Sequence, residues 1–359
     1  MIERVVLVSP RGFCAGVVRA IATVERALTI HGSPVYVRRA IVHNARVVER
    51  LTAAGARFVE ELDEVPEGAV VVLSAHGVAA SVYDEGSRRG LRIIDATCPL
   101  VAKVHQEVRR FAELGYDVVL VGHGGHDEVV GTLGQASCVR LVGHVRDVAG
   151  LRVRDPARVA CVTQTTLSSM DAAPAIDRLR QRFPAMMQPV AGDICFATRN
   201  RQRAVSWLAR NVDVVLVLGD PTSSNSRRLC EVASATGTPA HLIASLGELE
   251  TQWLAHAGVI GVSAGASTPE DVVAEVVAEL CQDGALLQRE VVLDERVSFA
   301  MPTEVASAPR RHKCRRRLRP RTTNGRLTTL GFSSSVRPRR PRRGKPTSSD
   351  RSPPRARAE

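Results

Sequence analysis

Seven short apolar runs, each followed by a polar or glycine-rich turn, constrain the fold of this 359-residue chain most strongly. The runs are apolar throughout and do not alternate with polar residues, which is typical of parallel strands buried on both faces. Longer amphipathic stretches lie between them and predict helices at residues 17–28, 45–54, 100–114 and 172–182. Strands that alternate with helices predict an α/β protein with mostly parallel sheets. The seven runs are RVVLV, AVVVLS, LRII, DVVLVG, VACVTQ, DVVLVLG and GVIGVS.

Small, polar or sulfur-bearing side chains follow all seven runs. In parallel α/β sheets, ligands bind beyond the carboxyl ends of the strands. Seven such ends therefore predict a common central cavity. The side chains belong to Cys14, His76, Cys98, His123, His126, Glu128, Thr163, Thr165, Ser223, Ser224, Asn225 and Ser267.

Three of the eight cysteines differ from the rest by their context. Cys14, Cys98 and Cys195 lie in turns of small or polar residues, and gaps of 84 and 97 residues divide the chain into near-thirds. Each third could thus deliver one thiolate to a shared centre. Three thiolates suit a zinc ion with histidine as fourth ligand, or a 4Fe–4S cluster with one iron open for substrate. The residues alone leave both alternatives open.

The remaining cysteines carry no such signal. No two of the eight are closer than 23 positions, so zinc ribbons, thioredoxin-like dithiols and ferredoxin-type cysteine runs are unsupported. Cys138, Cys161, Cys230 and Cys281 lie in apolar runs or on expected helix faces, where a cysteine usually packs as a small hydrophobic residue. Cys314 lies in a basic C-terminal segment.

The polar loops favour an oxygen-rich anion as the ligand. The segment TSSNS offers hydroxyls and an amide at a strand end, although such a cluster can also simply cap a helix. His43 and His76 are lone histidines that could be structural, whereas His126 follows two glycines and has Glu128 two positions on. A G-x-x-x-x-G-K pattern is absent, which argues against an NTP-binding P-loop. A diphosphate held by His, Ser and Asn side chains fits these residues.

Nine motifs in order along residues 1–300 carry a resemblance to a known family. They are PRGFCAGVVRAI, VHN, SAHGV, DATCPLV, GHGGHDEVVGT, TQTTLS, DICFATRNRQ, SSNSRRL and AGASTP. Single motifs of this kind are weak signals, but an ordered set of this length is highly specific. On these residues the chain resembles the 4-hydroxy-3-methylbut-2-enyl diphosphate reductase family, which performs the last step of the non-mevalonate isoprenoid pathway.

The resemblance implies a fold and a cofactor. It implies three α/β lobes in a pseudo-threefold arrangement around a central 4Fe–4S cluster, with Cys14, Cys98 and Cys195 as the cluster ligands. The implied divisions are an N-terminal strand, 1–13, that joins the central or third lobe, then lobes at 14–98, 99–195 and 196–305, and a tail at 306–359.

The resemblance also implies an activity. Two electrons and two protons are added to the substrate, water is expelled, and isopentenyl and dimethylallyl diphosphate are formed. The open iron would act as a Lewis acid on the hydroxyl oxygen, while Glu128 and Thr165 would handle protons. No flavin or nicotinamide fingerprint appears, so a ferredoxin or flavodoxin is the implied electron donor. The substrate would be held by His43, His76, His126, Thr165, Ser223, Ser224, Asn225 and Ser267.

One motif departs from the family pattern. GHGGHDEVVGT has Gly124, Asp127 and Val130 where an acidic residue, a proline and an acidic residue are expected, respectively. His126 and Glu128 are intact, so the expected chemistry is unaffected.

Positive charge is concentrated at the C-terminal end. Residues 306–359 contain 18 Lys and Arg and 2 Asp and Glu, a net +16, whereas the preceding residues carry −4. This Arg-, Pro- and Ser-rich segment predicts a disordered tail, either a tether for nucleic acid or an acidic partner, or an extension without function. The acidic body argues against a dedicated nucleic-acid-binding metal protein. That class and a non-redox iron–sulfur dehydratase are the alternatives to the reductase.

The sequence predicts a cytoplasmic protein that does not enter a membrane. Its first ten residues hold an apolar run of only four, which is not a secretory signal. No stretch approaches the roughly eighteen apolar residues of a membrane span. The cysteines should therefore be reduced or bound to metal.

Overall fold

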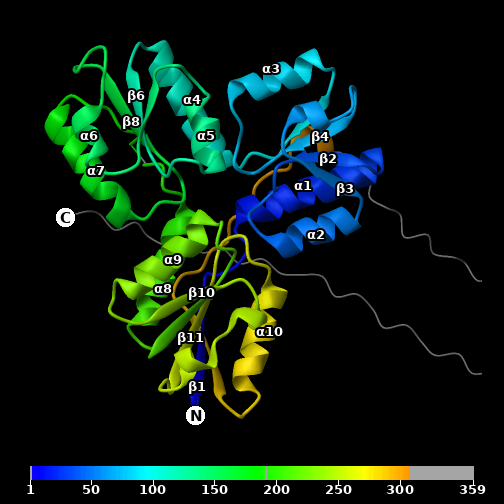
Figure 1. Ribbon diagram of the computed structural model, residues 1–359, viewed down its shortest axis with the longest axis vertical. Coiled ribbons are helices and arrows are strands. Elements are labelled where there is room, and N and C mark those ends of the chain that lie inside the picture. The colour runs from blue at the N-terminus through cyan, green and yellow to red at the C-terminus, as the bar shows by residue number, and fades with distance from the viewer. Residues whose placement is uncertain (1, 191, 307–359) are drawn as a thin grey trace, which may run out of the picture. The chain divides into compact units, whose positions relative to one another are not determined.

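A computed structural model of the chain describes residues 2–190 and 192–306. Within these residues the strands form three separate sheets with helices packed on them, and every strand pairing in the sheets is parallel (Figure 1). The predicted α/β class is confirmed, and all seven apolar runs form strands. None of the described helices is long and apolar enough to cross a membrane.

The first sheet has the strand order β3-β2-β4-β5 and is covered on both faces. Val35 and Val72 pack with α1 and α2, whereas Tyr36 and Val71 pack with a short 3-10 turn on the opposite face. Burial on both faces explains why the strand at 70–73 is apolar at every position. The elements are α1 Ala15–His31, β2 Val35–Arg38, α2 Ala45–Ala53, β3 Ala56–Val59, η1 Leu62–Glu64, β4 Val70–Leu73, α3 Ala80–Arg88 and β5 Arg92–Asp95.

The second sheet has the order β7-β6-β8 and is also buried on two faces. Cys161 and Val119 pack toward α7, while Leu120 and Val162 pack toward α4. Cys161 is thus a small buried hydrophobic residue, as predicted. The elements are α4 Pro99–Glu113, β6 Asp117–Val121, α5 Asp127–Leu133, β7 Val139–Val142, α6 Asp147–Gly150, β8 Val159–Thr163 and α7 Ser169–Arg182.

The third sheet combines the two ends of the described chain in the order β10-β9-β11-β1-β12. The N-terminal strand β1 lies between two strands from the C-terminal third, β11 and β12. The elements are β1 Arg4–Ser9, α8 Phe196–Ala209, β9 Val214–Leu218, α9 Ser224–Ser234, β10 Ala240–Ile243, η2 Leu246–Glu248, η3 Thr251–Leu254, β11 Val259–Ala264, α10 Glu270–Cys281 and β12 Leu286–Val291.

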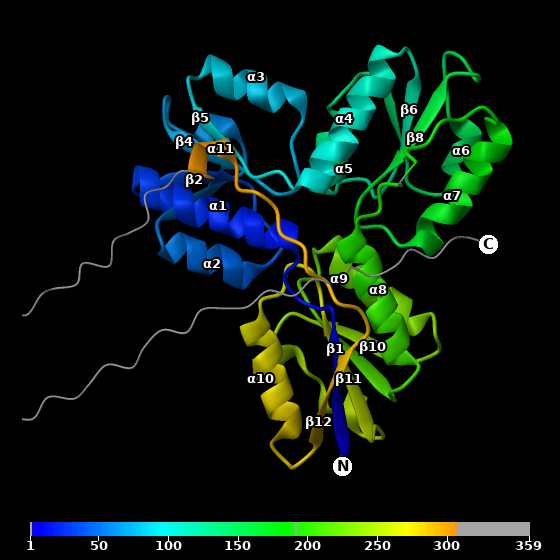
Figure 2. The same cartoon turned by 180° about the vertical axis from the view of Figure 1, so that it is seen from behind.

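The segment after β12 leaves the third sheet and returns to the first. It ends in the short helix α11, Thr303–Ala306, which lies beside α1 (Figure 2). Val305 is fully buried in the core that α1 forms with β2, and Arg26 donates a hydrogen bond to its carbonyl oxygen. The range 196–305 expected for the third lobe thus ends in residues that pack on α1. The lobe divisions stay a prediction, and the expected tail lies outside the described residues beyond Ala306.

Candidate active site

The twelve side chains that the family resemblance assigns to the cofactor, the substrate and proton transfer all line one cavity. All but Cys195 follow the carboxyl ends of strands, and the three sheets all contribute, for example Cys14 after β1, His43 after β2 and Thr165 after β8. The predicted common cavity is confirmed, while the roles of the individual residues stay predictions. The twelve are Cys14, His43, His76, Cys98, His126, Glu128, Thr165, Cys195, Ser223, Ser224, Asn225 and Ser267.

The three cysteines occupy the same kind of position in three helices. Cys14, Cys98 and Cys195 are the N-cap residues of α1, α4 and α8, helices of 17, 15 and 14 residues. The N-terminus of a helix carries partial positive charge and unpaired backbone N–H groups. The Sγ atom of Cys195 accepts one such bond, at 3.3 Å from the backbone nitrogen of Thr198. The helix N-termini therefore offset part of the cost of negative charge on the sulfur atoms.

The surroundings of the sulfur atoms fit a bound metal centre. A Cβ atom at Gly16 would lie 2.7 Å from Cys98 Sγ and 3.8 Å from Cys14 Sγ, so the glycine leaves the space between them open. Burial raises the pKa of the Cys98 thiol to about 12 and that of the Cys195 thiol to about 11. Thiolates at these positions need a nearby positive charge, which a metal centre supplies. Three thiolates are the donors that zinc and iron–sulfur clusters prefer.

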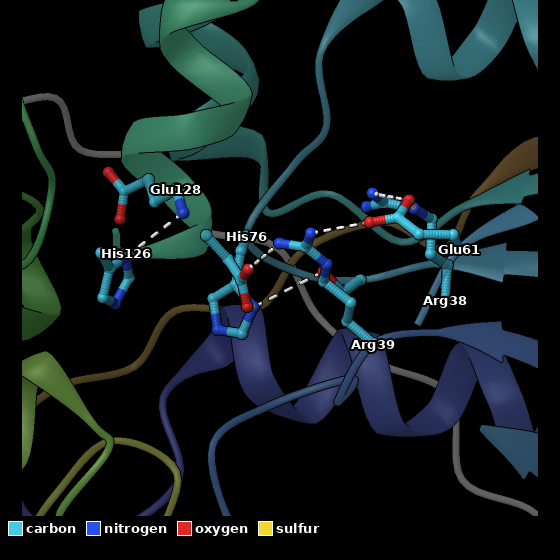
Figure 3. Close-up of polar contacts among 8 residues, drawn as sticks. Arg38, Arg39, Glu61, His76, His126 and Glu128 are labelled. Carbon is cyan, nitrogen blue, oxygen red and sulfur yellow. Dashed lines mark hydrogen bonds and ion pairs between the residues drawn. The ribbon is translucent and has the colours of Figure 1, made fainter. Parts of the chain in front are cut away.

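His43, His76 and His126 form a second group, the histidine cluster. Their ring centroids lie 4.2 Å apart for His43 and His76, 5.3 Å for His43 and His126, and 5.9 Å for His76 and His126. Burial lowers the pKa of His76 well below its usual value and lowers the pKa of His126 to about 4. The rings of His76 and His126 are therefore neutral at neutral pH when no ligand is bound. Because His126 Nδ1 accepts a hydrogen bond of 3.2 Å from the backbone nitrogen of Glu128, its ring proton is assigned to Nε2 (Figure 3).

Unpartnered polar atoms indicate that the cavity receives a polar ligand. Among the described residues, Nδ2 and Oδ1 of Asn225 and Nε2 of His43 are buried without a hydrogen-bond partner. Buried polar groups are normally paired, so a ligand is the natural partner. Ser223 caps α9 by accepting a bond from the backbone nitrogen of Ser226, which places another helix N-terminus at this end of the cavity. Such an end favours an anion.

Glu128 is buried and bonded to Thr165 through both carboxyl oxygens. The Thr165 backbone nitrogen donates to Glu128 Oε1 at 2.6 Å, and Thr165 Oγ1 lies 3.0 Å from Oε2. Burial raises the pKa of Glu128 to about 7, although the bonds from Thr165 act in the opposite direction. A carboxyl group with this pKa can give up and take back a proton at neutral pH.

Several supporting residues lie inside the matched motifs but were assigned no role from the sequence. Gln164 bonds the backbone nitrogen of His123 at 3.0 Å, and Thr166 Oγ1 bonds Ser224 Oγ at 3.1 Å. Arg201 is almost fully buried and donates to the carbonyl oxygen of Gly12, two residues before Cys14. An arginine in a helix would ordinarily be expected on the surface. His123 and Thr163, which also follow strands, do not line this cavity.

One cavity of this α/β fold contains three thiols at helix N-termini, a histidine cluster and a buried carboxyl group. This combination is typical of metal-dependent α/β enzymes. The LytB protein family matches residues 5–281 of the chain. The 4-hydroxy-3-methylbut-2-enyl diphosphate reductase of Acidithiobacillus ferrooxidans is 50% identical over 312 residues, which cover 86% of this chain and 99% of that protein. The chain thus belongs to the LytB protein family, together with the 4-hydroxy-3-methylbut-2-enyl diphosphate reductases.

Two solved structures agree with this assignment. The E-1-hydroxy-2-methyl-but-2-enyl-4-diphosphate reductase from Plasmodium falciparum superposes with a TM-score of 0.82 at 36% identity, covering 85% of this chain and 97% of that one. An (E)-4-hydroxy-3-methyl-but-2-enyl diphosphate reductase, described as the terminal enzyme of the non-mevalonate pathway, superposes with a TM-score of 0.57 at 32% identity, covering 79% of this chain and 100% of that one. The resemblance predicted from nine motifs is confirmed, and the chain is an enzyme of the reductase class.

Proposed function

We propose that the chain reduces 4-hydroxy-3-methylbut-2-enyl diphosphate to isopentenyl and dimethylallyl diphosphate, using a 4Fe–4S cluster held by Cys14, Cys98 and Cys195. Two electrons and two protons enter, the C–O bond to the hydroxyl group breaks, and water leaves. The observation that carries the proposal is the shared cavity, because three thiols and the unpartnered polar atoms of Asn225 and His43 line the same space. One small substrate could therefore contact the thiol end and the polar end of the cavity at the same time.

The sulfur end of the cavity would hold the cofactor. When bound, the cluster supplies electrons and a Lewis-acidic iron for the hydroxyl end of the substrate. Cys14, Cys98 and Cys195 would hold it as thiolates, and the N-termini of their helices would lower the cost of that negative charge.

The polar end would hold the diphosphate. The neutral ring of His126 presents Nε2–H as a donor, and the Asn225 amide and the hydroxyl groups of Ser223, Ser224 and Ser267 add further donors. Hydrogen bonds to charged phosphate oxygens are among the stronger ones that proteins make. The diphosphate would thus fix the orientation of the short organic chain.

Glu128 would supply the proton that allows the hydroxyl group to leave as water. Its pKa of about 7 keeps a substantial protonated fraction at neutral pH, and the Thr165 hydroxyl within hydrogen-bond distance would orient or relay the proton. Positioned acids of this kind typically accelerate a reaction about 10²–10⁴-fold.

The test is a visible spectrum of anaerobically purified protein, followed by a product assay. We expect broad brown absorbance that bleaches with dithionite, and conversion of the substrate to both diphosphate products by a dithionite-reduced dye. Colourless protein with one bound zinc would favour the zinc alternative. Substrate loss without any reductant would favour the non-redox dehydratase.

The physiological electron donor and the cytoplasmic location stay predictions. A ferredoxin or flavodoxin should replace the dye in the product assay, because the chain has no flavin or nicotinamide fingerprint of its own. Turnover with NADPH alone would contradict this expectation.

A further inference from the structure

We propose that Asp127 is the counter-charge of the histidine cluster and a positioning residue for it, so that the cluster takes up a proton when diphosphate binds. The inference rests on the proposed function of that cluster. It concerns a position where the sequence motif departs from the family pattern, since Asp127 stands where a proline is expected.

One carboxylate faces histidines from two different sheets. Asp127 is the first residue of α5 and directly follows His126. Its Oδ2 atom lies 4.0 Å from Nδ1 of His76. One ring nitrogen each of His43 and His76 and one carboxylate oxygen of Asp127 all lie within 4.8 Å of one another. The charge of Asp127 is therefore close to the rings of His43 and His76, and it also raises the pKa of the adjacent His126.

The other oxygen of Asp127 is held by Arg39. Arg39 Nη1 donates to Asp127 Oδ1, and Nη2 donates to Glu61 Oε1 at 2.9 Å; Glu61 also accepts from Arg38 (Figure 3). Arg39 is the one described non-glycine residue with a positive φ, +56°. That conformation costs about 1–2 kcal/mol, and ion pairs on both sides of Arg39 offset the cost. The position of Asp127 is thus fixed from the first sheet.

The helix α5 is also fixed, at its middle and just after its end, against the turn that carries His76. A Cβ atom at Gly131 would lie 2.8 Å from the carbonyl oxygen of Gly77, so the two backbones are in direct contact. Gln135 Nε2 donates to the carbonyl oxygen of Val78 at 2.8 Å. These attachments keep Asp127 and His76 at a fixed separation.

The surrounding charges determine what Asp127 does. Burial lowers the pKa of His43 and of His126, and Asp127 acts against burial by raising the pKa of both. Arg227 lowers the pKa of both rings, His123 lowers that of His126, and Asp220 raises that of His43. His76 is subject to burial and to its two neighbouring rings, which lower its pKa.

Binding of an anion changes this balance. The negative charges of a diphosphate raise the pKa values of the rings, and Asp127 acts in the same direction. Repulsion between Asp127 and the ligand is reduced because Arg39 neutralises the Oδ1 side, while Oδ2 faces His76. A divalent cation is a poorer fit to these donors, because the guanidinium of Arg39 already occupies the carboxylate.

The test is calorimetry of inorganic diphosphate binding to the anaerobically purified, cluster-loaded protein. Titrations in two buffers of different ionisation enthalpy give the number of protons taken up. Asp127→Asn removes the charge, keeps the shape and leaves Arg39 paired with Glu61. We expect lower proton uptake and about tenfold weaker binding near neutral pH, equivalent to about one pKa unit. The deficit should shrink at acidic pH, where the rings of the diphosphate complex are protonated in both proteins.

The matched control is Glu61→Gln, which removes the other carboxylate that pairs with Arg39 but does not face a ring. Gln keeps an oxygen that can accept the hydrogen bond from Arg39, so Asp127 stays in place. The variant should leave proton uptake unchanged and change the affinity less than about twofold, since Glu61 is half exposed. Asp127→Glu should restore part of the proton uptake. Equal proton uptake in the wild type and Asp127→Asn, or equal losses in Asp127→Asn and Glu61→Gln, would overturn the inference. A wild type that binds no diphosphate would overturn the assignment of the histidine cluster as well.

Discussion

The protonation of Glu128 depends on its buried position in the wall of the cavity. Burial raises its pKa to about 7, so the protonated form is present below that pH and is lost as the pH rises through it. We expect turnover to fall as the pH rises above about 7. Glu128→Gln keeps the shape and removes the proton, so it should lower kcat about 10²–10⁴-fold and leave substrate affinity within a few-fold.

The measurement is kcat and substrate dissociation constant across the pH range for both proteins. The pH dependence above neutrality should disappear from the residual activity of Glu128→Gln. Near-normal turnover in this variant would exclude Glu128 as the proton source.

The cysteines give a second prediction at this scale. Serine at Cys14, Cys98 or Cys195 should abolish iron binding, because each replaces a thiolate at a helix N-cap with a poor ligand for iron. Serine at Cys161, which is buried in the core of the second sheet, should leave the iron content unchanged. Iron and sulfide analysis of anaerobically purified variants checks this. Retention of iron in Cys98→Ser together with its loss in Cys161→Ser would contradict the assignment.

Single residues were predictable where a local pattern marks them. Cys14, Cys98 and Cys195 stand in turns of small residues, and the structure brings them to one cavity. The roles of Asp127 and Arg201 depend on partners 88 and 189 positions away. No local sequence pattern predicts such contacts, because these segments come together only when the sheets have folded.

Among the elements, those with continuous apolar runs or a clear helical periodicity were predictable. The expected helices at 17–28 and 100–114 correspond to α1 and α4, and their ends differ from the observed ones by one to three residues. The strands β2, β3, β7, β10 and β12 were missed. β12 reads LLQREV and is largely exposed at the edge of its sheet, so it lacks the apolar run that burial on two faces would require.

The helix α1 gives a prediction that separates fold from cofactor. Gly16→Ala should favour the helix by up to about 1 kcal/mol, yet the new methyl group would lie 2.7 Å from Cys98 Sγ. We therefore expect a folded protein with strongly reduced iron content. Gly150→Ala in α6 is the matched control, since its Cβ would meet no atom within 4 Å. Circular dichroism and iron analysis measure the two effects, and full iron content in Gly16→Ala would contradict the expectation.

At the scale of the molecule, the segment after β12 closes the core of the first sheet. Val305 is fully buried there and Met301 packs against it. A chain that ends at residue 306 should fold, bind its cluster and turn over substrate normally. A chain that ends at residue 291 should lose about 4.5–8 kcal/mol of unfolding free energy. Burial of Val305 contributes about 1.5–3 kcal/mol, and the loss of Glu295 leaves the buried Arg201 without its carboxylate partner at a cost of about 3–5 kcal/mol.

Denaturant unfolding of the two shortened proteins measures this difference. Equal stability of both would show that the segment does not hold the core together. Comparison of the full chain with the 306-residue form in RNA binding at low and high salt separates a tether from an extension without function.

The placement of β1 between β11 and β12 constrains the order in which the parts of the chain can fold during synthesis. β1 is made first, but both of its neighbours belong to the last part of the described chain. The strands and helices of the first and second sheets are made much earlier and can begin to pack, although the core of the first sheet still lacks Val305. Cys14 follows β1 and Cys195 caps α8, so the three cysteines cannot converge until the final strands have been made. Binding of the proposed cluster would thus be a late event, because a stalled or truncated nascent chain has no finished cavity.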